Sequence, residues 1–166
     1  RRRMGEIVSR GEVVVDMFSG IGYYSLPILV HSEAHHVHCC EWNDDAISSL
    51  EWSLRRNGVE SRCTIYPGDN RKSSKIIGKV ANRVIMGLLP SSEGSFGAAM
   101  EVLSESGGVV HIHGLANPRE YSSWAEGIVQ QIGSLRPSCV VEIQKINRIK
   151  SYAPHWDHVV LDVFVQ

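Results

Sequence analysis

The chain has 166 residues, of which 43% are hydrophobic and 21% charged, a composition typical of one soluble globular domain with a sizeable core. Its apolar runs are too short to cross a bilayer, and no signal-type stretch follows the basic N-terminus, which argues against membrane-spanning and secreted proteins. The net charge of −1 lacks the basic excess of a self-sufficient nucleic-acid binder. We therefore expect either a small substrate or RNA affinity that comes mainly from a part of the protein outside this chain.

The cysteines and the start of the chain indicate the expected cellular compartment and the expected domain organisation. The four cysteines are scattered and form no CxxC pair, so we expect reduced, buried thiols in a cytoplasmic protein rather than a disulfide scaffold or a zinc site. The chain begins at Arg1 without an initiator methionine. We expect residues 1–166 to be a single domain from a longer protein whose upstream part recognises RNA.

Strand and helix patterns alternate along the chain, which predicts a mostly parallel sheet covered by helices. The predicted elements in chain order are a strand at about residues 13–15, a helix at 23–30, a strand at 35–40, a helix at 43–56, strands at 62–66 and 83–86, a helix at 93–104, a strand at 109–113, a helix at 118–135, and closing strands at 140–149 and 158–165. A loop at residues 150–157 would join the last two strands. The pattern predicts an α/β fold with seven strands, in which the final hairpin adds an antiparallel strand.

Polar and glycine-rich clusters stand at the carboxyl ends of the predicted strands, where ligands bind in such a sheet. Gly20 and Gly22 allow a tight turn close to a ligand, and Asp16 before them can accept a hydrogen bond from an ammonium group. Glu41 suits a pair of ribose hydroxyls, and Asp69 suits the exocyclic amine of adenine. Together they predict a nucleoside site; the alternative is that each acid is a helix cap or a solvated charge.

Three other kinds of site are disfavoured. A nicotinamide dinucleotide site would need a third glycine where Tyr24 and Ser25 stand, and a P-loop would need a GK[ST] motif that the chain lacks. A metal site could be suspected from four histidines near one another in the sequence. They are divided between the end of a predicted helix and a predicted strand, however, and no carboxylate pair is present to complete the coordination. These four are His31, His35, His36 and His38. We expect no metal site.

Four stretches resemble the motifs of a family that contains tRNA methyltransferases and wybutosine-synthesis enzymes. They are residues 16–23, 40–43, 68–71 and 151–155, and the similarity runs through essentially the whole chain. The resemblance implies a Rossmann-like class I S-adenosylmethionine-dependent methyltransferase fold with helices on both faces of the sheet. It also implies S-adenosylmethionine as the group donor and a tRNA as partner.

The residues after the fourth strand separate two chemistries within this family. The methyltransferase branch modifies the guanosine next to the anticodon and carries Asn-Pro-Pro at this place. This chain has residues 87–90, Gly-Leu-Leu-Pro, and a His-Ile-His run at 111–113, and both resemble the wybutosine branch. That branch transfers the 3-amino-3-carboxypropyl group to 4-demethylwyosine in tRNA-Phe. An apolar wall in place of an asparagine and two stiff prolines would let the donor's amino-acid arm face the substrate.

The alternatives are guanine-N1 methyl transfer by the same family and a catalytically silent fold that binds a cofactor or a protein. The residues expected to contact the cofactor are Arg1, Asp16, Phe18, Ser19, Gly20, Gly22, Tyr23, Glu41, Trp42, Asp69, Asn70 and Gly87. The residues expected to contact the substrate are Leu88, Pro90, Tyr152 and His155.

The roles expected for individual residues rest on different arguments. The resemblance implies that Arg1 holds the carboxylate of the donor's arm, with a solvated basic end as the alternative. Tyr152 would stack on the substrate base from a loop, or pack within that loop. We expect His111 and His113 to be packed or hydrogen-bonded rather than catalytic. The sequence identifies no general base.

Overall fold

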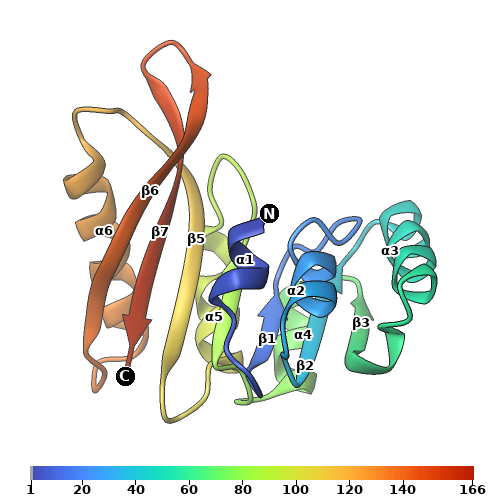
Figure 1. Ribbon diagram of the computed structural model, residues 1–166. Coiled ribbons are helices and arrows are strands. Elements are labelled where there is room, and N and C mark those ends of the chain that lie inside the picture. Colours follow the sequence, from blue (N-terminus) through green and yellow to red (C-terminus); the bar gives the residue numbers. More distant parts are fainter. Residues whose placement is uncertain (1) are drawn as a thin grey trace.

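The computed structural model describes residues 2–166, and its seven strands in that range form one sheet in the order β3-β2-β1-β4-β5-β7-β6 (Figure 1). The strands are β1 (Val13–Asp16), β2 (His36–Glu41), β3 (Cys63–Pro67), β4 (Arg83–Met86), β5 (Gly108–Ala116), β6 (Val141–Ala153) and β7 (Trp156–Val165). Strands β1 to β5 pair in parallel, whereas β7 runs antiparallel to both β5 and β6. The predicted seven-stranded, mostly parallel α/β sheet is confirmed.

Helices cover both faces of this sheet (Figure 1). They are α1 (Arg2–Ile7), α2 (Ser25–His31), α3 (Asp44–Arg56), α4 (Asn70–Ile77), α5 (Phe96–Val102) and α6 (Tyr121–Leu135). Helices α1 to α3 lie on one face and α4 to α6 on the other, each group over its own buried cluster. None of these helices, over residues 2–166, combines the length and the apolar character needed to cross a bilayer.

The central strands supply side chains to both clusters in turn. Val14 and Ile85 pack under α1 to α3, while Val15 and Val84 pack under α4 to α6. All four are fully buried, as expected for parallel strands covered on both faces. Each such side chain contributes about 1.5–3 kcal/mol of burial free energy, so the centre of the sheet is a rigid base for the loops at its edge.

The predicted loop at residues 150–157 is wrong. Strand β6 continues to Ala153 and β7 begins at Trp156, so the turn between them is short and includes His155 at a positive φ of 66°. The pairing of β6 with β7 contains three register irregularities, which leave Gln144, Ile149 and Tyr152 without a partner in the ladder. Such bulges break the alternation of polar and apolar residues, which is why the sequence pattern suggested a loop. The hairpin extends beyond the rest of the sheet (Figure 1).

Two helices and one helix boundary also differ from the prediction. Helix α1 occupies part of the basic N-terminal run, and α4 begins at Asn70, immediately after the predicted binding loop. Both are short and depend on tertiary contacts more than on intrinsic propensity. The predicted helix at 93–104 is a 3₁₀ turn, Glu93–Ser95, followed by α5.

Candidate functional site

The carboxyl ends of β1, β2 and β4, with the loop after β3, enclose a cavity of about 780 Å³ that we call the strand-end cavity. Its lining consists of Met17, Phe18, Cys40, Glu41, Trp42, Gly68, Asp69, Asn70, Arg71, Gly87, Leu88, Gly94 and Ser95. The sheet edge brings together residues that are far apart in the sequence, at the place where α/β sheets bind ligands.

The turn after β1 is fixed by Glu41. The backbone N–H of Gly20 donates to Glu41 Oε2 over 2.7 Å, and Oε1 accepts from the N–H groups of Trp42 and Asn43 over 3.0 and 2.9 Å. Gly20 and Gly22 both have positive φ, 53° and 91°, a region that glycine enters without strain. A carboxylate has about four acceptor positions, so one position of Glu41 stays open to a hydroxyl donor in the cavity.

Asp69 and Asn70 both act in the structure around α4. Asp69 caps the helix by accepting from the Arg71 N–H over 2.9 Å and forms a 2.7 Å ion pair with the Arg71 guanidinium. The hydrogen bonds from Arg71 lower the pKa of Asp69 to about 2. Asn70 donates to the Met17 carbonyl over 2.9 Å and accepts from Ser95 Oγ over 3.0 Å. Asn70 therefore ties the end of β1 to the loop after β4, and Asp69 lines the cavity with both of its carboxylate oxygens hydrogen-bonded to Arg71.

Asp16 lies behind the cavity wall rather than on it. Its side chain is fully buried, accepts from Ser25 Oγ over 2.7 Å and from the Phe18 N–H over 3.3 Å, and lines neither this cavity nor the next. Burial raises the pKa of Asp16 to about 6, with a further contribution from the charge of Glu41. The structure thus places under the turn a carboxylate that is protonated more easily than an ordinary aspartate.

A second cavity of about 550 Å³, the histidine cavity, meets the first at Phe18 and Gly87. Its lining consists of Arg3, Met4, Phe18, Ser19, Gly20, Ile21, Tyr23, Tyr24, Gly87, Leu89, His113, Ile149, Lys150, Tyr152, His158 and Val160. Phe18 and Gly87 thus lie between the two cavities.

The loop after β4 separates its two leucines. Leu88 lines the strand-end cavity and Leu89 lines the histidine cavity, with Gly87 in both. A Cβ on Gly87 would stand 3.1 Å from the Tyr24 ring, so glycine permits the close approach of these two segments. Pro90 lines neither cavity. The predicted contact at Leu88 is thus joined by an unpredicted residue, Leu89, on the other side.

Two histidines that the sequence did not bring together are in contact in the histidine cavity. His113 Nδ1 and His158 Nε2 lie 2.9 Å apart, and the His113 ring is 5.1 Å from the Tyr24 ring. Burial lowers the pKa of His113 to about 3 and also lowers the pKa of His158. Both rings are therefore neutral at pH 7. The register of β5 with β7 places these residues side by side, information that a single sequence does not carry.

A buried charged network anchors α1 next to this cavity. Arg3 pairs with Asp162, which also contacts His111 Nδ1 at 2.6 Å. His111 Nε2 lies 2.7 Å from the Arg83 guanidinium, and Arg83 donates to Glu12 over 2.7 Å. The expectation that His111 is a hydrogen-bonded core residue is confirmed. The network holds Arg3 at the cavity wall.

The other predicted contacts do not all line these two cavities, and Gly22 lines neither of them. Ser19 and Tyr23 line the histidine cavity, and the largely exposed Trp42 lines the strand-end cavity. Tyr152 also lines the histidine cavity, but from a bulge of β6 rather than from a loop, and His155 lines a separate pocket on the other side of the hairpin. Arg1 lies outside the described residues.

The histidines near β2 have partners on β3. His36 Nε2 lies 2.8 Å from Thr64 Oγ1, and His38 Nδ1 lies 3.0 Å from the Tyr66 hydroxyl. Within residues 2–166, His, Cys, Asp and Glu side chains form no group of three or more that could hold a metal ion.

Comparisons with known proteins agree with this architecture. The family model of the TRM5/TYW2 methyltransferase domain matches residues 1–131. The chain is 42% identical over 165 residues to tRNA wybutosine-synthesizing protein 2/3/4 of Oryza sativa subsp. japonica, covering 97% of this chain and 16% of that protein. It is 38% identical to the tRNA wybutosine-synthesizing protein 2 homolog of Danio rerio, covering 97% of this chain and 48% of that protein.

A solved structure extends the comparison to three dimensions. The structure of M. jannaschii TYW2 in complex with AdoMet superposes with a TM-score of 0.91 at 30% identity, covering 99% of this chain and 73% of that chain. The chain thus spans less than half the length of either of the two relatives named above. Because the family model covers most of its residues, the chain belongs to the TRM5/TYW2 methyltransferase-domain family.

Proposed function

We propose that this chain is the S-adenosylmethionine-dependent catalytic domain of an enzyme that transfers the 3-amino-3-carboxypropyl group to 4-demethylwyosine, next to the anticodon of tRNA-Phe. The observation that carries the proposal is the loop after β4. There Gly87 stands where the two cavities meet, and Leu88 and Leu89 give each cavity an apolar wall.

The strand-end cavity fits the adenosine part of the donor. Phe18, Trp42 and Leu88 supply apolar surface, and the open acceptor position of Glu41 suits a ribose hydroxyl. Asp69 can accept a hydrogen bond from the adenine amine once the Arg71 guanidinium no longer occupies one of the carboxylate oxygens of Asp69. These two acceptors therefore match a nucleoside with a ribose hydroxyl and an exocyclic amine.

The histidine cavity fits the amino-acid arm. S-adenosylmethionine supplies a sulfonium carbon for transfer, and the electron pair of the broken C–S bond leaves with a neutral thioether. Arg3 and Lys150 line the cavity and offer cations to the arm's carboxylate, a role that the sequence predicted for Arg1. The buried charge of Asp16 favours a nearby cation, because the interior screens charges weakly.

Selection of the transferred carbon is a matter of position, because a thioether needs no acid to leave. With the arm in the histidine cavity, Tyr152 is placed to stack on the incoming base. The low pKa of His113 makes it a poor proton acceptor, so His113 and His158 line this space as a hydrogen-bonded pair. The apolar side chain of Leu89 gives the base no polar anchor against the donor's methyl group.

The proposal also covers the setting of the enzyme. Residues 1–166 would be one catalytic domain, and RNA recognition would come mainly from other parts of the full-length protein, since the net charge here is −1. The four cysteines are free, which fits a cytoplasmic location. The partner is tRNA-Phe, without a membrane or a metal.

The test uses the full-length protein and tRNA-Phe carrying 4-demethylwyosine, with S-adenosylmethionine labelled either in the methyl group or in the carboxyl carbon. Carboxyl label in the RNA, with methyl label retained on methylthioadenosine, is the expected result. Methyl label in the RNA would instead show guanine-N1-type methyl transfer and overturn the proposal. Neither label in the RNA would also overturn it and leave only the family and the fold.

A further inference from the structure

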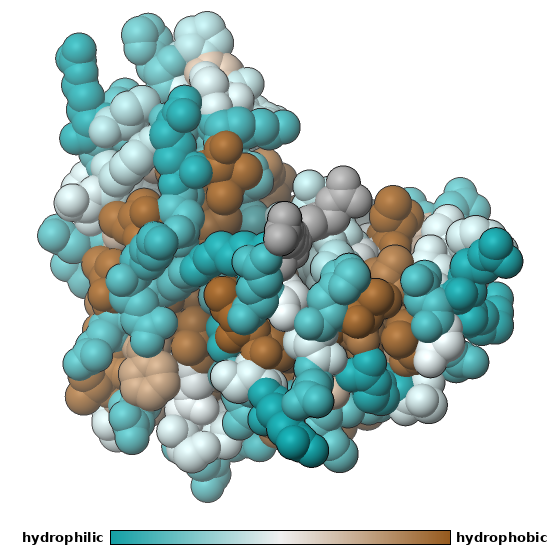
Figure 2. Space-filling view, in the orientation of Figure 1, coloured by the Kyte–Doolittle hydropathy of each residue, from teal (hydrophilic) through white to brown (hydrophobic). Residues whose placement is uncertain are grey.

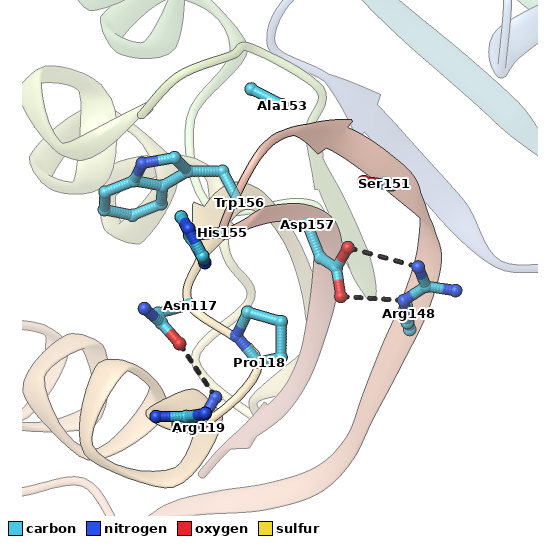
Figure 3. Close-up of a pocket in the computed structure, with 9 residues that line it drawn as sticks. All are labelled: Asn117, Pro118, Arg119, Arg148, Ser151, Ala153, His155, Trp156 and Asp157. Carbon is cyan, nitrogen blue, oxygen red and sulfur yellow. Dashed lines mark hydrogen bonds and ion pairs between the residues drawn. The ribbon is translucent and has the colours of Figure 1, made fainter.

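A separate pocket of about 500 Å³ lies on the side of the β6–β7 hairpin that faces away from the histidine cavity, and we call it the hairpin pocket (Figure 3). It is lined by residues from the loop after β5, from β6, from the hairpin turn and from the start of β7, namely Asn117, Pro118, Arg119, Arg148, Ser151, Ala153, His155, Trp156 and Asp157. None of these residues lines the strand-end or the histidine cavity.

The end of β6 is a wall between this pocket and the histidine cavity. Ile149, Lys150 and Tyr152 line the histidine cavity, whereas Arg148 and Ser151 line the hairpin pocket. The two register irregularities in this stretch divide the side chains in this way. Ser151 and Tyr152, which are adjacent in β6, thus line different spaces, so the hairpin pocket is the space next to the one in which Tyr152 would contact the target base.

The pocket combines a flat aromatic surface with a cation. Trp156 is 49% exposed, and Figure 3 shows its indole beside His155, across from Pro118 and Asn117. Asn117 Oδ1 accepts from the Arg119 N–H over 3.0 Å, which fixes the backbone of the loop. Among residues 2–166, the Arg119 guanidinium has no carboxylate partner within ion-pair distance.

The acid of the pocket is already neutralised. Asp157 accepts from Arg148 Nε and Nη2 over 2.7 and 3.2 Å and also from the Tyr121 hydroxyl. These hydrogen bonds lower the pKa of Asp157, and the hydrogen bonds from Arg148 have the largest effect. The net charge offered to a ligand therefore comes from Arg119. On the face drawn in Figure 2, the upper part, where the hairpin extends in Figure 1, is mainly hydrophilic with some hydrophobic residues between.

We infer that the hairpin pocket binds an unpaired nucleotide that flanks the modified base in the RNA, with its base stacked on Trp156 and its phosphate at Arg119. Unpaired RNA bases are held by stacking on aromatic rings, and phosphates by guanidinium groups. The inference rests on the proposed function for its substrate, an RNA with an unpaired target base. It adds a site on the opposite side of the hairpin from the donor.

The experiment compares full-length wild-type protein with Trp156→Ala, Trp156→Phe and Arg119→Ala, bound to tRNA-Phe carrying 4-demethylwyosine. Trp52→Ala and Arg56→Ala on the exposed face of α3 are the matched controls. Trp156→Ala should weaken tRNA binding roughly 5- to 150-fold, the effect of one lost base stack, while Trp156→Phe restores most of it. Arg119→Ala should weaken binding and reduce the salt slope by about one phosphate contact.

A second measurement identifies the occupant as a nucleotide. An RNA with an abasic site next to the target base should lose affinity for the wild type but lose little more in Trp156→Ala, because one stack cannot be removed twice. Equal losses in both proteins would overturn the inference and point to another occupant, such as a protein segment. Unchanged tRNA binding by Trp156→Ala and Arg119→Ala would overturn it as well.

Failure of this site and failure of the proposed function can be told apart. Carboxyl label transferred equally by the wild type and Trp156→Ala, with equal tRNA affinity, would leave the function standing and overturn the pocket. Loss of tRNA affinity in Trp156→Ala, with no label transferred by the wild type, would support the pocket and overturn the function. S-adenosylmethionine affinity should be the same in all variants, because no altered residue lines either donor cavity.

Discussion

At the scale of single residues, the acids at the carboxyl ends of β1 and β2 and after β3 have three different environments. Glu41 is held by three backbone N–H groups, Asp69 by Arg71, and Asp16 by a buried serine. The sequence predicted that all three are functional but could not distinguish them, because burial and hydrogen bonding arise from the packed loops. The same acids also serve structural roles, so the two interpretations weighed from sequence are not exclusive.

Glu41 should matter to donor binding through its charge. In Glu41→Gln the amide group replaces one acceptor that faces a backbone N–H, and the open position for a hydroxyl is weakened. Since a hydrogen bond to a charged group contributes about 1.5–3 kcal/mol, we expect S-adenosylmethionine to bind roughly 10- to 150-fold more weakly by calorimetry. Glu51→Gln on exposed α3 is the control, and unchanged affinity in Glu41→Gln would remove the nucleoside interpretation of the strand-end cavity.

Asp16 should make donor binding depend on pH. Its pKa is raised to about 6 in the free protein, and the donor's sulfonium and ammonium charges favour the ionised carboxylate. Binding must therefore displace a proton below pH 6, so the affinity should fall about tenfold between pH 7 and pH 5.

Calorimetry over this range provides the check, with two comparisons. Asp16→Asn should give a flatter profile, and methylthioadenosine, which lacks the charged arm, should bind almost independently of pH. Protonation of His158 also adds positive charge near the arm, but its effect would persist in Asp16→Asn. A wild-type profile as flat as that of the variant would contradict this role of Asp16.

At the scale of elements, the predictable ones were those with strong local signals. Helix α3 has Asn43 as its cap, accepting from the N–H groups of Asp45 and Ala46, and both its ends agree with the sequence. Helix α4 was missed because Asp69 and Asn70 were interpreted as ligand contacts, although Asp69 caps the helix and Asn70 begins it. The hairpin was misjudged because bulges disturb its period. Pairing between distant strands, which creates the His113–His158 contact, left no local signal.

The docking of α1 should depend on the buried pair of Glu12 and Arg83. Burial acts to raise the pKa of Glu12, but hydrogen bonds and charge from Arg83 hold it below its ordinary value. In Glu12→Gln the guanidinium of Arg83, which is 7% exposed as a residue, loses its countercharge. We expect a loss of about 3 kcal/mol in the free energy of unfolding, measured by urea denaturation.

The surface pair Lys79–Glu105 is the matched control, because both of its side chains are mostly exposed. Glu105→Gln should cost less than about 1 kcal/mol. Similar losses for the two variants would mean that the pair of Glu12 and Arg83 is no more important than a surface contact. In the wild type, the contribution of Glu12 is present at neutral pH and is lost as the pH falls below about 4.5.

At the scale of the whole molecule, donor binding and RNA binding have different requirements. Both cavities that we propose for the donor are lined by residues of this chain, whereas a net charge of −1 gives little attraction for a tRNA backbone. We expect residues 1–166 alone to bind S-adenosylmethionine with about the affinity of the full-length protein but to modify tRNA at least roughly tenfold more slowly. Equal turnover of the two forms under the same salt conditions would refute this division.

The bulged end of β6 has an evolutionary consequence. Successive residues at this end of β6 line either the histidine cavity or the hairpin pocket. A residue that lines one of them can therefore be substituted without changing the lining of the other. Specificity for the target base and specificity for its neighbour can thus evolve independently. Insertions and deletions are different, since a shift of one residue would exchange the side chains presented to the two sides. Among relatives, this segment should therefore keep a constant length.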